Sequence, residues 1–261
     1  MFSGQWGLAA ALLLAVLVAV SAGAWAFTIW MGAGMSSAML LGSLSTVGGV
    51  ALFLAIWFVM MVAMMFPAAA PMVQAYSGLS ASEAHGRPSR VALTSVFLGT
   101  YIAVWAAIGL LIAVLGVLLA PRMPVLAGTG TLGVSLAGAV LIAAGVYQTT
   151  PLKQSCLRGC RSPISFLVTD WRPGFRGAVR LGWRHAAYCV GCCGLLFAVL
   201  FAVGLMALPW MALLAVVIFV EKLIPGRTGF WVSAGLGGAL AVVGVLFLLL
   251  PHWGAWALGL S

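Results

Sequence analysis

Seven apolar runs of about 20 residues constrain the fold of this chain more than any other feature. A helix needs about 20 residues to cross a hydrocarbon layer of about 30 Å, and it pairs its own backbone polar groups there. The runs span about 8–30, 49–70, 91–120, 131–150, 186–207, 209–224 and 230–250. We therefore predict an all-α fold, a polytopic membrane helix bundle with about seven transmembrane helices.

The composition supports this prediction and excludes other classes of protein. Hydrophobic residues make up 64% of the chain and charged residues 6%, which is far too apolar for a soluble domain of 261 residues. The net charge of +9 is spread too thinly for a nucleic-acid-binding protein. We expect one integral membrane domain over 1–261, with the lipid bilayer around it and a basic, cysteine-containing cytoplasmic loop at about 151–185.

The basic residues indicate how the helices are oriented. With the N-terminus in the cytoplasm and the C-terminus outside, all of the 12 basic residues except Arg122 fall on the inner side. The second-to-third loop then holds Arg87 and Arg90, and the sixth-to-seventh turn holds Lys222 and Arg227. This is the bias of the positive-inside rule, so we predict a multi-pass protein with its N-terminus in and its C-terminus out.

All five cysteines lie between positions 156 and 193. Cys189, Cys192 and Cys193 are spaced i, i+3 and i+4, so they share one face if the fifth span is helical from its start. We expect the positive end of that helix, beside Arg184 and His185, to favour thiolates, which bind metals. Cytoplasmic thiols stay reduced, so metal binding or thiol chemistry is more plausible than disulfides. Packing as small apolar side chains is the alternative.

The remaining candidate ligands are one cysteine pair, a histidine and several methionines. Cys156 and Cys160 are four residues apart, although Gly159 and Pro163 weaken the prediction of a helix there. His185 is a candidate ligand or a partner of one. Four methionines, Met60, Met61, Met64 and Met65, form two i, i+4 pairs on the second span, at the depth of the three cysteines. Met61 and Met65 are the candidate ligands among them. They also suit simple packing.

Thioethers and thiolates are soft donors, which select Cu(I) over magnesium, calcium or manganese. Zinc is the alternative metal, although its usual four ligands in two close pairs match this spacing only loosely.

Pro67 and Pro71 predict that the second span kinks or ends there. Glu221 beside Lys222 fits an interfacial ion pair or an intramembrane carboxylate with a role at the site. With three acidic residues in the chain, a hydrolase or a proton pump is disfavoured.

Several segments resemble a bacterial family of predicted metal-binding integral membrane proteins, a domain of unknown function. The segments are Gly145-Val146-Tyr147-Gln148, Pro151-Leu152-Lys153, Cys156 to Cys160, Arg161-Ser162-Pro163, Tyr188-Cys189-Val190-Gly191-Cys192-Cys193 (a YCxGCC motif) and Glu221-Lys222-Leu223. The methionine pairs followed by two prolines are also similar. The resemblance implies a multi-span protein of the bacterial inner membrane with a metal site at these sulfurs, and it brings no established reaction. In the family an aromatic residue tends to follow the double cysteine, where this chain has Gly194.

Together these features favour a protein that binds a soft metal, most plausibly Cu(I), and acts in metal transport, delivery or homeostasis rather than as an enzyme. Its primary ligands are Cys189, Cys192 and Cys193, with Met61 and Met65 as thioether partners. Cys156 and Cys160 form an inner pair that docks or releases the metal, and a metallochaperone or a membrane complex is the expected partner. The alternatives are a structural or assembly subunit of a membrane complex and a thiol redox enzyme.

Overall fold

The computed structural model describes every residue except 1–2, 36, 83–88, 120–130 and 258–261. The described residues form helices and no strand. The helices are α1 (Ser3–Gly34), α2 (Ser37–Gly42), the 3-10 turn η1 (Ser43–Ser45), α3 (Val47–Ser82), α4 (Arg90–Leu119), α6 (Thr131–Tyr147), α7 (Pro151–Arg161), α8 (Pro163–Asp170), α9 (Gly174–Val203), α10 (Leu208–Leu223), α11 (Gly226–Leu249) and α12 (Pro251–Ala257).

The all-helical prediction is confirmed, and the described residues contain five or six candidate spans. Five helices, α1, α3, α4, α9 and α11, are long and apolar enough to cross a membrane. A sixth span results if α6 and α7, which meet at 66°, are one broken span. The predicted sixth run forms α10, whose 16 residues are short for a span. The count of seven therefore stays a prediction, as does the orientation, because Arg87 and Arg122 lie outside the described residues.

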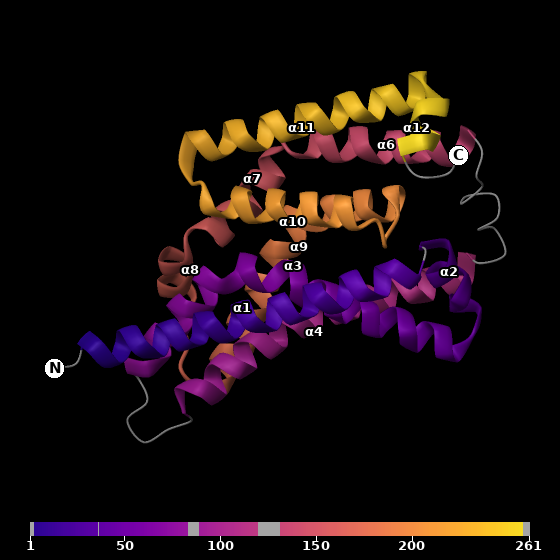
Figure 1. The fold of residues 1–261 in the computed structure, drawn as a ribbon. Coiled ribbons are helices and arrows are strands. Elements are labelled where there is room, and N and C mark those ends of the chain that lie inside the picture. Colours follow the sequence, from indigo (N-terminus) through magenta and orange to yellow (C-terminus); the bar gives the residue numbers. More distant parts are fainter. Residues whose placement is uncertain (1–2, 36, 83–88, 120–130, 258–261) are drawn as a thin grey trace.

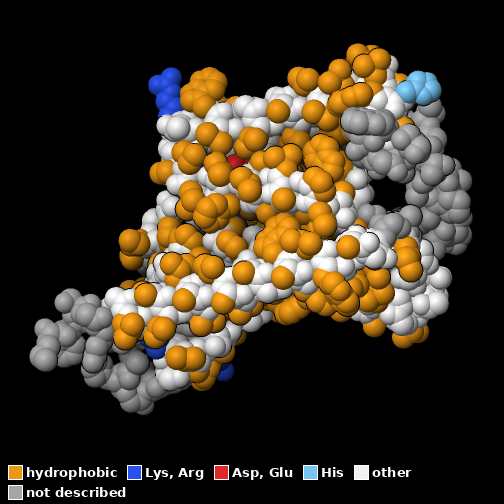
Figure 2. Space-filling model, viewed as in Figure 1, with side chains coloured by type: hydrophobic (Ala, Val, Ile, Leu, Met, Phe, Trp, Pro, Cys, Tyr) orange, Lys and Arg blue, Asp and Glu red, His pale blue; other side chains and the backbone are white. Residues whose placement is uncertain are grey.

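The long helices lie roughly side by side, and their ends define two ends of the molecule (Figure 1). The start of α1, the short helices α7 and α8, and the junction of α10 with α11 lie at one end, while α2 and α12 lie at the other. Hydrophobic side chains cover the visible face between these ends (Figure 2), and many of them are exposed on α1, α4, α10 and α11. Such an apolar exterior is typical of a surface that faces lipid.

The segment at 151–185, predicted as a loop, is mostly helical. Thr150 caps α7, because its side chain accepts a hydrogen bond from the backbone N–H of Lys153, and Pro151 occupies the first helical turn. The helix continues through Gly159 to Arg161, so the doubt about a helix at Cys156 and Cys160 was wrong. Gly174, whose φ of 74° suits glycine, then begins α9 twelve residues earlier than predicted.

The second span neither ends nor breaks at its two prolines, because α3 runs from Val47 through Pro67 and Pro71 to Ser82. Pro67 has no N–H to donate to the carbonyl of Ala63, four residues earlier. The hydroxyl of Ser21, on α1, donates to that carbonyl at 2.8 Å instead. A neighbouring helix thus supplies the hydrogen bond that the proline removes. This partner lies 42 positions away in the sequence, so the local pattern alone predicted that the helix kinks or ends at the prolines.

Candidate metal centre

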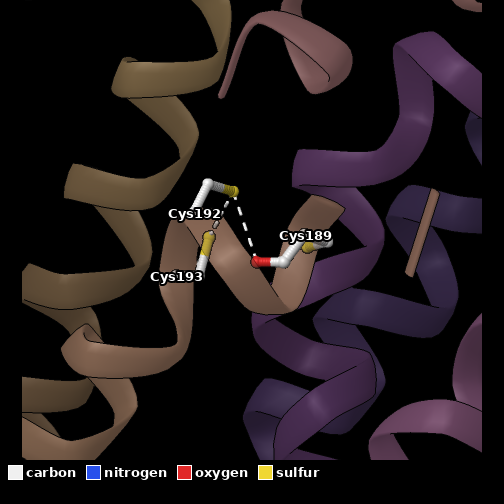
Figure 3. A group of neighbouring side chains, drawn as sticks. All are labelled: Cys189, Cys192 and Cys193. Atoms are coloured by element: carbon white, nitrogen blue, oxygen red, sulfur yellow. Dashed lines mark hydrogen bonds between the residues drawn. The ribbon is translucent and has the colours of Figure 1, made fainter. Parts of the chain in front are cut away.

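The three cysteines of α9 form a compact sulfur cluster in the interior of the bundle. The Sγ atoms of Cys189, Cys192 and Cys193 all lie within 4.8 Å of one another, and all three side chains are buried. Figure 3 shows them on consecutive turns of one helix, where the Cys192 thiol donates to the carbonyl of Cys189 at 3.3 Å and lies 3.2 Å from the Cys193 sulfur. The predicted convergence on one face is confirmed.

The prediction that these cysteines begin a helix was wrong. Because α9 starts at Gly174, Cys189 lies in the middle of the helix, where no free backbone N–H group faces it. The dipole at the helix start therefore does not explain a thiolate. Arg184 does not explain it either, since its guanidinium forms an ion pair with Asp170.

Two side chains from other helices bind the Cys189 sulfur instead. The Lys222 ammonium, on α10, donates to Sγ at 3.1 Å, and the Tyr101 hydroxyl, on α4, forms a hydrogen bond with the same atom at 3.1 Å. Lys222 and Tyr101 are buried. A buried ammonium requires a negative partner, so its position against a thiol favours the thiolate of Cys189.

Two more sulfurs complete the cluster. The Met65 Sδ, on α3, lies 3.9 Å from the Cys189 Sγ, and the Cys160 Sγ, on α7, lies 3.9 Å from the Cys192 Sγ. Helices α3, α7 and α9 thus bring five sulfur atoms to one place, from positions 65 to 193 of the chain. We use "sulfur cluster" for Met65, Cys160, Cys189, Cys192 and Cys193.

The other predicted ligands have different surroundings. Met61 is buried in the core, and among the described residues no hydrogen bond joins its sulfur to the sulfur cluster. Cys156 lies against the backbone of α9 at Gly191. His185 stacks on Tyr101 with 5.2 Å between ring centroids, and neither of its ring nitrogens has a hydrogen-bond partner among the described residues. The structure therefore brings five of the eight predicted ligands together in the sulfur cluster, and it leaves Met61, Cys156 and His185 outside.

Glu221 does not pair with its neighbour Lys222. Its Oε2 accepts a hydrogen bond at 2.7 Å from the ammonium of Lys153, which also donates to the side chain of Gln148. Arg161 anchors the same region, because it donates to the backbone carbonyl of Glu221 at 2.6 Å. Because Glu221 pairs with Lys153, the Lys222 ammonium is available to the Cys189 sulfur. The same ion pair joins α7 to α10, and this connection holds Cys160 and Lys222 in place.

The donor set fits a soft metal. Two sulfurs that share one ion, each at about 2.3 Å, lie no more than about 4.6 Å apart. The spacing of the Cys189, Cys192 and Cys193 sulfurs is close to this limit, so small side-chain rotations bring these three cysteines around one ion. Thiolates and a thioether without carboxylates are the ligands that Cu(I) prefers.

Comparison with known proteins agrees with this chemistry. The comparisons with curated proteins and with solved structures each found no match. The family model PpoB2, described as a copper chaperone, matches residues 54–247, which include every member of the sulfur cluster together with Tyr101 and Lys222. Because the match covers well over half of the 261 residues, this chain belongs to the PpoB2 copper chaperone family.

Proposed function

We propose that this protein is a membrane-embedded carrier of Cu(I), which it binds at the sulfur cluster and hands over to a partner. The copper is cargo rather than a resident cofactor. The observation that carries the proposal is the set of four thiols and one thioether that α3, α7 and α9 bury together, with the Lys222 ammonium of α10 against the Cys189 sulfur. Membership of a copper chaperone family supports the same conclusion.

Cys189, Cys192 and Cys193 act as the primary ligands in this proposal, and Met65 is the thioether partner. One Cu(I) bound by three thiolates carries a net charge of −2, and the Lys222 ammonium beside Cys189 offsets part of it. The Tyr101 hydroxyl forms a second hydrogen bond with the Cys189 sulfur. Together they stabilise a charged complex in an interior that water does not reach.

The apolar exterior supports a location in a membrane. We propose that the chain spans the bacterial inner membrane with its N-terminus in the cytoplasm, so that α7, α8 and the basic start of α9 lie at the cytoplasmic end. This placement supports uptake of copper by Cys160 from the reducing side. It also accounts for free cysteines, because the five thiols form no disulfide with one another.

Elemental analysis of the purified protein tests the proposal. Wild-type protein loaded with Cu(I) under reducing, anaerobic conditions should retain about one copper per chain, whereas the triple variant C189S/C192S/C193S should retain none. C156S is the matched control, because Cys156 lies outside the sulfur cluster and should keep full copper. Equal copper in the wild type and the triple variant would refute the proposal. A thiol redox enzyme would instead show reversible oxidation of these thiols without bound metal.

A further inference from the structure

A pocket of about 200 Å³ opens between α3, α7, α8 and α10, and it leads to the sulfur cluster. Its rim is formed by the exposed residues Pro71, Phe219 and Leu223. Its inner part is lined by Cys160 and Lys222, which are buried. The pocket therefore connects the surface of the protein with two groups that touch the candidate ligands.

Cys160 is the sulfur that a molecule in this pocket reaches first. Its exposed fraction is 7%, compared with 0% for Cys189, 1% for Cys192 and 2% for Cys193. The Cys160 Sγ lies 3.9 Å from the Cys192 Sγ. A metal ion bound to Cys160 can therefore pass to Cys192 in a single ligand exchange. The pocket thus provides a route by which a metal ion passes from Cys160 to the cysteines of α9.

The charge of the pocket selects what can enter it. Two cations, Arg161 and Lys222, line it, and no acidic side chain does. Arg161 is held in place because its Nε donates to the carbonyl of Glu221 at 2.6 Å and its Nη2 to that of Gly229 at 3.3 Å. These bonds occupy part of a guanidinium that carries five N–H donors. Such a pocket repels a hydrated Cu(I) cation and attracts an anion.

We propose that Cu(I) enters this pocket as an anionic complex with two small thiolates, and that Cys160 is the first protein sulfur to bind it. This inference rests on the proposed function and adds the chemical form of the substrate. A Cu(I) ion bound by two thiolates that carry no other charged group has a net charge of −1. Arg161 and Lys222 attract such an anion. The volume of the pocket suits small thiols rather than a loop of a carrier protein.

The transfer is a ligand exchange in which copper stays Cu(I). The Cys160 sulfur forms a bond to copper, one Cu–S bond to a carrier thiolate breaks, and the thiol proton of Cys160 leaves on the released carrier thiol. Cys192 then displaces the second carrier thiolate in the same way, and its proton leaves on that thiol. Each step conserves the number of Cu–S bonds, so no oxidant or reductant is needed.

Loading rates measured from two copper sources test the inference. Full-length protein in detergent would be mixed anaerobically with Cu(I) in excess 2-mercaptoethanol, an anionic complex, or with the cationic Cu(I) acetonitrile complex, and Cu–thiolate absorbance would be followed. We expect R161Q to slow loading from the anionic complex by about tenfold at low salt and to leave loading from the cationic complex unchanged or faster. R161K, which keeps the charge, should restore most of the rate.

Two further variants test the pocket itself. L223W places a large side chain at the rim and should slow loading from the thiolate complex, while L213W, an exposed position on the same helix away from the pocket, should load like the wild type. C160S should slow loading from the thiolate complex, because a serine hydroxyl does not take Cu(I) from the carrier thiolate.

The outcomes separate this inference from the proposed function. If the wild type binds no copper from either source, the proposed function fails. If the wild type loads fully and R161Q, L223W and C160S load from the thiolate complex at the wild-type rate, the entry pocket is refuted and the copper site stands. Loading that occurs only from a copper-loaded carrier protein, with no response to the small thiolate complex, also overturns the inference.

Discussion

Removing the charge of Lys222 should weaken Cu(I) binding strongly. The ammonium lies 3.1 Å from the Cys189 sulfur. With an effective dielectric constant of about 20, Coulomb's law gives about 5 kcal/mol for a cation and a thiolate at this distance. The cost of burying both charges offsets part of this energy, and removal of one partner of a buried pair typically costs about 2–5 kcal/mol. We therefore expect K222M to lose about 2–3 kcal/mol of binding free energy.

This loss corresponds to a Kd that is about 30- to 150-fold higher. Competition with a chromogenic Cu(I) chelator at fixed pH measures it, and circular dichroism with thermal unfolding checks that the variant folds. R227M is the matched control, because Arg227 is an exposed cation five residues after Lys222, and its loss should leave the Kd unchanged. An unchanged Kd in a folded K222M protein would refute the role of Lys222 as the countercharge of the site.

Three other changes probe the site and the packing. M65L should raise the Kd for Cu(I) several-fold in the same competition assay, while M61L should leave it unchanged; equal effects would contradict the placement of Met65 alone at the sulfur cluster. Y101F removes one hydrogen bond to Cys189, worth about 1 kcal/mol, so the Kd should rise about fivefold, and no change would contradict this contact. G145A should lower the free energy of unfolding by about 1–3 kcal/mol, because the new Cβ would lie 2.5 Å from a backbone oxygen of α11, whereas G235A, with open space around it, should not destabilise; equal stability of the two would contradict the close packing of α6 on α11.

The periodic and compositional features of the sequence predicted the fold well. Long apolar runs identify helices regardless of what they pack against, because a chain in lipid must pair its own backbone groups. The i, i+3, i+4 spacing of Cys189, Cys192 and Cys193 depends on helix geometry alone, so their convergence followed from the sequence. The bounds were less accurate, since α9 begins at Gly174, where polar residues hide the helical pattern.

Contacts between distant helices could not be predicted in the same way. Tyr101 carries no sign in the sequence that it binds Cys189, 88 positions away. Lys222 did carry a signal, because a cation in an apolar helix needs a partner, but the adjacent Glu221 was the obvious candidate. In the structure, Glu221 forms its ion pair with Lys153, a residue that the sequence analysis placed in a loop. The choice between these partners depends on how α7 packs, and local patterns do not encode it.

Helix packing also explains why Met65 joins the sulfur cluster and Met61 does not. Met61 and Met65 are four residues apart and share a helix face, so the sequence ranks them equally. Met65 lies one helical turn further along α3, and its sulfur lies 3.9 Å from the Cys189 Sγ. Depth along the helix separates the two residues, and it becomes known only once the helices are packed together.

X-ray absorption at the copper K-edge tests the central claim most directly, because it identifies the atoms bound to copper in the loaded protein. The account predicts an edge typical of Cu(I) and a first shell made of sulfur alone, with no imidazole scattering, since His185 lies outside the sulfur cluster. A first shell of nitrogen or oxygen, or a sulfur shell that persists unchanged in C189S/C192S/C193S, would contradict it.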